Sequence, residues 1–86
     1  MKVPDQITLR AEVQLFAAAM ERELRANDYK GGWTHMTMRR LMTRLRQEVE
    51  ELENADGTES VMREAADVAN FAMMIADVCG GLREDG

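Results

Sequence analysis

The chain has 86 residues, of which 45% are hydrophobic and 31% charged, and its formal net charge is −5. This length predicts one domain, with a core near the lower limit for independent stability. The acidic balance argues against nucleic-acid binding driven by phosphate neutralisation, and it suits a protein that holds divalent cations. One proline, few aromatic residues and eight methionines, with many alanines, leucines, glutamates and arginines, favour an all-α fold.

The expected location follows from the cysteine content and from the apolar segments. Cys79 is the only cysteine, which rules out an intrachain disulfide and favours a reducing, cytoplasmic environment. Residues 1–5 carry no signal-peptide pattern, and the apolar run at 65–79 is too short and too acidic for a membrane span. We therefore expect a cytoplasmic protein with neither a membrane nor a nucleic acid as its partner.

The first predicted helix begins at Pro4-Asp5 or at Thr8 and runs to about Asn27. Apolar residues recur at steps of three and four, which is typical of a helix that packs through one face. This predicted face comprises Leu9, Val13, Phe16, Ala17, Met20 and Leu24. Polar residues off the face, including Glu12 and Glu23, are expected to lie in solvent.

Residues 27–36 form a predicted loop that contains two adjacent glycines and the only Trp, Tyr and His of the chain. Two interpretations stay open for Trp33 and Lys30. They can stack a base and hold a phosphate, or Trp33 can fill the corner between two helices while the glycines permit the turn. For His35 a structural or solvated role is favoured, because a lone histidine is commonly one or the other.

A second helix is predicted from a cap at Thr34 or Thr37 to about Ala55. Its expected apolar face comprises Met38, Leu41, Met42, Leu45, Val49 and Leu52. Glu48 and Glu51 are spaced i,i+3 and border this face on a helical wheel.

The third helix is predicted to begin at Thr58 or Ser60 and to end at Gly80-Gly81. The connection at 54–58 is short, so the second and third helices should be antiparallel neighbours. From 65 to 79 the helix is apolar all round except at Asp67, Asn70 and Asp77. A helix without a polar face must be buried inside protein, which predicts an oligomer, either a dimer or a tetramer, for so short a chain.

Asp67 lies in the middle of this apolar helix. A buried carboxylate without a partner costs several kcal/mol, a large part of the roughly 5–15 kcal/mol that stabilises a domain. An arginine, a proton or a metal ion must therefore lie beside it.

Two carboxylate pairs should face each other across the antiparallel second and third helices. The pairs are Glu48 with Glu51, and Glu64 with Asp67. Arg44 and Arg63 can neutralise some of this charge but cannot balance all of it, whereas divalent ions can. Oxygen ligands select hard ions, so we expect Mg²⁺ first and Mn²⁺ second.

These residues also resemble a known family. Gln47-Glu48-Val49-Glu50-Glu51-Leu52, followed by Glu64-Ala65-Ala66-Asp67, is similar to the ExxE…ExxD signature of the all-α MazG-like nucleoside triphosphate pyrophosphohydrolases. Residues 30–33 and 66–77 are similar to small phage- and prokaryote-type members of that family. The resemblance covers roughly residues 16–80, and it implies one helical domain over 1–86. The acidic composition of residues 82–86 predicts a frayed tail after the last helix.

The resemblance implies Mg²⁺-dependent cleavage of a ribo- or deoxyribonucleoside triphosphate between the α and β phosphates, which releases the monophosphate and pyrophosphate. It assigns Glu48, Glu51, Glu64 and Asp67 as metal ligands. Many members have glutamate where this chain has Gln47, so the catalytic base would have to be Glu48 or Glu51. Bound metals polarise phosphoryl oxygens and activate water, so the mechanism agrees with the chemistry of the residues.

Four further residues are candidates for substrate contacts, namely Lys30, Trp33, Asn70 and Asp77. Two other functions remain open. One is a non-catalytic acidic helical module that binds a basic partner, and the other is a degenerate relative that binds nucleotide or metal without turnover.

Overall fold

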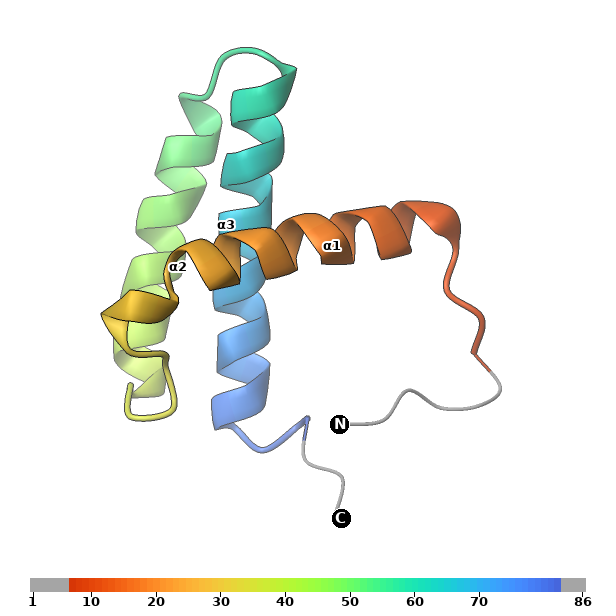
Figure 1. The fold of residues 1–86 in the computed structure, drawn as a ribbon. Coiled ribbons are helices and arrows are strands. Elements are labelled where there is room, and N and C mark those ends of the chain that lie inside the picture. Colours follow the sequence, from red (N-terminus) through yellow and green to blue (C-terminus); the bar gives the residue numbers. More distant parts are fainter. Residues whose placement is uncertain (1–6, 83–86) are drawn as a thin grey trace.

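The computed structural model describes residues 7–82, and these residues form helices without any strand (Figure 1). The elements are α1 (Ala11–Ala26), the short 3₁₀ turn η1 (Asp28–Lys30), α2 (Met38–Glu53) and α3 (Thr58–Val78). The predicted all-α class, with three main helices, is therefore confirmed.

The helices α2 and α3 form the predicted antiparallel hairpin, and α1 lies across α3 (Figure 1). Within residues 7–82, α3 is the helix that packs against both of the others. Side chains from α2, α3 and the end of α1 consequently meet near the middle of the hairpin.

Helix α1 begins later than predicted. Its first residue is Ala11, and Arg10 occupies the N-cap with an extended backbone and no capping side chain. Thr8 therefore does not start the helix, while Pro4-Asp5 lies outside the described residues.

Thr37, one of the two threonines predicted to cap the second helix, is the N-cap of α2. The Thr37 hydroxyl accepts a hydrogen bond of 3.2 Å from the Arg40 amide, which satisfies one of the free amides of the first turn. The other candidate, Thr34, lies in the preceding loop.

Gly57, rather than Thr58 or Ser60, is the N-cap of α3. Its backbone has φ 90° and ψ 149°, a conformation that residues other than glycine rarely adopt. The N-cap position therefore has a backbone conformation that favours glycine, and Thr58 is already the first residue of the helix.

The predicted end of α3 at the paired glycines is confirmed. The Gly80 amide donates to the Asp77 carbonyl and the Gly81 amide to the Ala76 carbonyl, both at 2.9 Å. Gly80 has φ 92°, so the helix closes with a Schellman motif after Val78.

Burial in the single chain is lower than the apolar pattern of α3 predicts. Ala66 and Asn70 are its buried residues, and most of the remaining apolar stretch is half-buried. The reason is geometric, since two neighbouring helices cannot surround a third.

The predicted apolar faces of the other two helices are also covered only in part. Leu41 is fully buried, whereas Met38, Met42 and Val49 on the same helix are 45%, 38% and 39% exposed. In α1 the buried residue is Ala19, while Val13 of the predicted face is exposed. The chain therefore retains a substantial apolar surface.

No helix among residues 7–82 combines the length and the apolar character that crossing a membrane requires.

Candidate metal and substrate site

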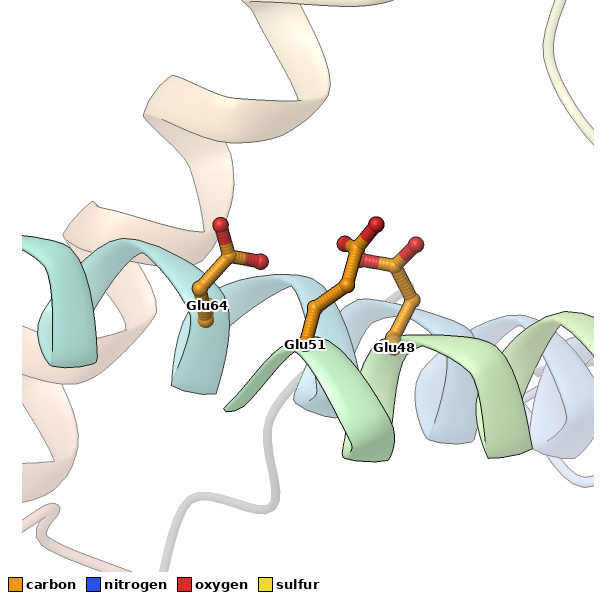
Figure 2. Close-up of side chains that lie close together, drawn as sticks. All are labelled: Glu48, Glu51 and Glu64. Atoms are coloured by element: carbon orange, nitrogen blue, oxygen red, sulfur yellow. The ribbon is translucent and has the colours of Figure 1, made fainter. Parts of the chain in front are cut away.

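Three glutamates converge where α2 and α3 lie side by side. Glu48 and Glu51 come from α2 and Glu64 from α3, and one carboxylate oxygen of each lies within 4.8 Å of the others. Figure 2 shows the three side chains on the same side of the two helices. The i,i+3 spacing on α2 and the antiparallel neighbour together explain this convergence. We call Glu48, Glu51 and Glu64 the glutamate triad.

The glutamate triad could hold a divalent cation. The Glu64 Oε2 atom is buried and accepts no hydrogen bond, while Oε1 has only a long contact of 4.0 Å with the Arg63 guanidinium. Buried polar atoms are normally paired, so an orphaned carboxylate oxygen points to a missing positive partner. All three donors are carboxylates, which suits Mg²⁺ or Mn²⁺.

Arg44 is one of the two arginines that the sequence offered as partners, the other being Arg63, and it pairs with Glu48 rather than with Asp67. Its Nη2 lies 3.0 Å from Glu48 Oε2, and its Nη1 donates to the Gln47 side-chain oxygen. Glu48 is only 5% exposed, so it is the buried carboxylate of the site. Burial and the nearby Glu51 raise the pKa of Glu48, and Arg44 acts against both.

Asp67 is half-buried instead of fully buried as predicted. Burial, the largest cause, together with repulsion from Glu23, Glu48, Glu64 and Glu51, raises the pKa of Asp67 to about 6. The residue therefore faces other acids, and a proton or a bound cation is what can relieve the repulsion. Asp67 lies outside the glutamate triad, and its role as a fourth ligand stays a prediction.

A cavity of about 490 Å³ opens beside these acids. It is bounded by the end of α1, the loop after it, α2 and α3. Its lining includes six of the predicted site residues, namely Lys30, Trp33, Glu48, Glu51, Asp67 and Asn70. Cavities of this size commonly hold small-molecule ligands.

Glu64 lines a second hollow, of about 510 Å³. Arg44 and Glu51 line both hollows. These two side chains therefore border two spaces that small molecules can enter.

Asn70 has one satisfied and one unsatisfied polar atom. Its Nδ2 donates a hydrogen bond of 3.0 Å to the Met20 carbonyl of α1, which ties α1 to α3. Its Oδ1 is buried and accepts no hydrogen bond. The residue is only 3% exposed, and it lines the cavity. Asn70 thus has a structural role and, in addition, one free acceptor.

Asp77 binds the loop through Trp33 and does not line the cavity. Its Oδ2 accepts a hydrogen bond of 3.0 Å from the Trp33 indole, across 44 residues of sequence. Trp33 is half-buried and lines the cavity, so it both closes the corner between helices and contributes to the wall. His35 is exposed at the cavity, in agreement with a solvated role.

Glu23 is the site residue that the sequence analysis missed. It lies on α1, is half-buried, lines the cavity and is the acid with the largest repulsive effect on Asp67. The sequence placed it on the solvated face of the first helix. A usable signal existed, because Glu23 lies three residues after Met20 and beside Leu24, at the edge of the apolar face.

Comparison with models of protein families, with curated proteins and with solved structures finds no match to this chain. The carboxylates, the cavity beside them and their charges are therefore the grounds for a function.

Proposed function

We propose that the protein is a Mg²⁺-dependent nucleoside triphosphate pyrophosphohydrolase, with Mn²⁺ as an alternative ion. The observation that carries the proposal is the glutamate triad, with the orphaned Glu64 oxygen at its edge and a ligand-sized cavity beside it. Five acids near one another, Asp67 and Glu23 included, are costly for a protein unless cations bind there.

In the proposed reaction a water oxygen attacks the α-phosphorus of the nucleotide. The bond from that phosphorus to the bridging oxygen breaks, and its electron pair leaves with pyrophosphate. Glu48 or Glu51 takes the proton of the water, because the neighbouring position 47 carries an amide that cannot act as a base. Bound metal would supply charge neutralisation at the phosphates and lower the pKa of the water.

The wall of the cavity provides the proposed substrate contacts. Lys30 would contact phosphate, Trp33 would stack on the base, and the free Asn70 acceptor would bind a hydroxyl or amino group of the substrate. Asp77 would contribute by holding Trp33 in place.

The proposed assembly is a homodimer or a homotetramer in the cytoplasm. Exposed apolar side chains on α2, such as Met42 and Val49, and the half-buried α3 supply surface for subunit contacts.

The test is to incubate the protein and Mg²⁺ with each common ribo- and deoxyribonucleoside triphosphate, and to separate the products. Monophosphate and pyrophosphate are expected, and turnover should fall about 100-fold or more in Glu51→Gln. Glu53→Gln, an exposed glutamate on the same helix, is the matched control and should retain activity. Diphosphate with inorganic phosphate, or no turnover with any nucleotide, would contradict the proposal.

Metal binding separates the remaining alternatives. A protein that binds Mg²⁺ and nucleotide without turnover would be a binding module, and one that binds neither would be an acidic interaction module.

A further inference from the structure

Arg44 is the cation at the centre of the acidic site. Its guanidinium pairs with Glu48 at 3.0 Å, and its side chain is 40% exposed whereas that of Glu48 is 7% exposed. It lines both hollows that flank the carboxylates. The Arg44 side chain therefore has room on its solvent side to change its conformation, whereas the Glu48 side chain is enclosed by its neighbours.

A metal ion and Arg44 would compete for the same carboxylate. The guanidinium uses Glu48 Oε2, and Glu48 belongs to the glutamate triad. A divalent ion bound there would repel a guanidinium about 4 Å away, and even at an effective dielectric constant of about 20 this repulsion is substantial. This repulsion would weaken the contact between Arg44 and Glu48.

The packing of Arg44 gives it a pivot for such a movement. Its guanidinium carbon lies 5.0 Å from the centre of the Phe71 ring, a stacking contact that does not depend on Glu48. Phe71 lines the larger cavity, so a guanidinium that stays on this ring and turns away from Glu48 faces the space where the substrate is proposed to bind.

We propose that Arg44 exchanges partners, neutralising Glu48 in the metal-free protein and binding the polyphosphate of the substrate once metal occupies the acids. The second half rests on the proposed function. A guanidinium suits this task because its planar donors match the oxygens of a phosphate. Arg44 would neutralise the buried Glu48 before metal binds, and it would supply positive charge to the substrate afterwards.

The proposal predicts effects of opposite sign on metal and on phosphate binding. Arg44→Met keeps the length of the side chain but removes its charge. It should bind Mn²⁺ about tenfold more tightly in the absence of nucleotide, because a competing cation is gone. With saturating Mg²⁺ it should bind inorganic tripolyphosphate about 10- to 100-fold more weakly, because charged hydrogen bonds are lost.

Two further variants control the comparison. Arg44→Lys keeps the charge, so its Mn²⁺ affinity should stay near that of the wild type, while its tripolyphosphate affinity should fall several-fold for want of paired donors. Arg46→Met removes an exposed arginine from the same helix and should change neither affinity. Circular dichroism checks each fold, and Arg44→Lys still tests the proposal if Arg44→Met does not fold.

Calorimetric titration with Mn²⁺ and with tripolyphosphate measures these affinities without any turnover. Both affinities falling together in Arg44→Met would mean a structural role, and both unchanged would mean no role; either result overturns the exchange. Equal tripolyphosphate affinity in Arg44→Lys and wild type would remove the role of the paired donors. If the wild type binds Mn²⁺ and releases pyrophosphate while these tests fail, the exchange alone falls. If the wild type does not bind Mn²⁺, the proposed metal site falls with it.

Discussion

The ion pairing and the pKa values of the acidic side chains at the site depend on their burial and on the charges around them. Asp67 lies among acids, and Arg44, which lines the same cavity, pairs with Glu48. Glu48 is the more deeply buried of the two acids and therefore has the greater need of a partner. Asp67, which has no such partner among the described residues, has its pKa raised to about 6 by burial and by the surrounding acids.

Asp67→Asn should stabilise the metal-free protein and abolish pyrophosphate release. Asparagine has nearly the same shape but removes one charge from the repelling acids, so we expect a gain of about 1 kcal/mol after solvent screening is allowed for. Turnover should fall about 100-fold or more. Urea midpoints in EDTA and an assay with Mg²⁺ measure the two effects.

Asp56→Asn, an exposed position in the α2–α3 connection, should change neither quantity and serves as the control. A destabilised Asp67→Asn protein that still releases pyrophosphate would refute the metal site, because that pattern belongs to a broken ion pair.

The stability of the metal-free protein should depend on pH through Asp67. Its pKa is raised from 3.8 to about 6, so the folded state binds more protons than the unfolded state between these values. The stabilisation is therefore complete below the lower value, and it is lost as pH rises through about 6.

Urea midpoints in EDTA should accordingly rise, relative to those of Asp67→Asn, as pH is lowered from about 7.5 to about 5. The stabilisation by Mg²⁺ should shrink over the same range, because protons compete with the ion for the carboxylate. Parallel pH profiles for the two proteins would show that Asp67 does not titrate as described.

Among the elements, the loop between α1 and α2 depends on a distant part of α3. The Trp33 indole hydrogen bond to Asp77 joins the loop to the last turns of the chain's longest helix. Trp33 and Lys30 both line the cavity, so this hydrogen bond helps to fix the position of that part of the cavity wall.

Trp33→Phe should lower the free energy of unfolding by about 1–2 kcal/mol, since a hydrogen bond to a charged group is lost. Asp77→Asn keeps an acceptor oxygen and should cost less than Asp77→Ala. If the loop positions substrate, Trp33→Phe should also raise KM more than it lowers kcat.

Tyr29→Phe is the matched control, because Tyr29 is 82% exposed in the same loop. No loss of stability in either Trp33→Phe or Asp77→Ala would show that the hydrogen bond contributes nothing to stability.

At the scale of the whole molecule, the apolar surface exceeds what three helices can cover. Leu41 is the one large side chain that is fully buried among residues 7–82, and ten large apolar side chains in that part of the chain are exposed. A core this small predicts low stability for an isolated subunit, so association is expected to contribute to the fold.

Light scattering at micromolar concentration should therefore give a multiple of the 9.7 kDa chain mass. Met42→Glu should shift the mass towards that of one chain, because it places a charge in the exposed apolar face of α2. Thr43→Glu adds the same charge at the adjacent exposed position and should keep the assembly intact. A wild-type mass of 9.7 kDa would refute the oligomer.

The sequence by itself determined the features that depend on neighbours within a few residues. The three helices, the glycine stop after α3 and the antiparallel hairpin all follow from local spacing and turn chemistry, whereas the structure selected Thr37 over Thr34 as the cap of α2. The sequence also predicted that Glu48, Glu51 and Glu64 lie close together, because i,i+3 spacing puts Glu48 and Glu51 on one surface of α2 and the short connection makes α3 its neighbour.

The tertiary structure decided what depends on the path of α1 and on the depth of each side chain. The crossing of α1 over α3 brings Glu23 to Asp67 and the Met20 carbonyl to Asn70, and no local pattern specifies that crossing. Depth also decided that Arg44 neutralises Glu48 and leaves Asp67 to a proton or a cation, because burial selects which acid needs a partner most.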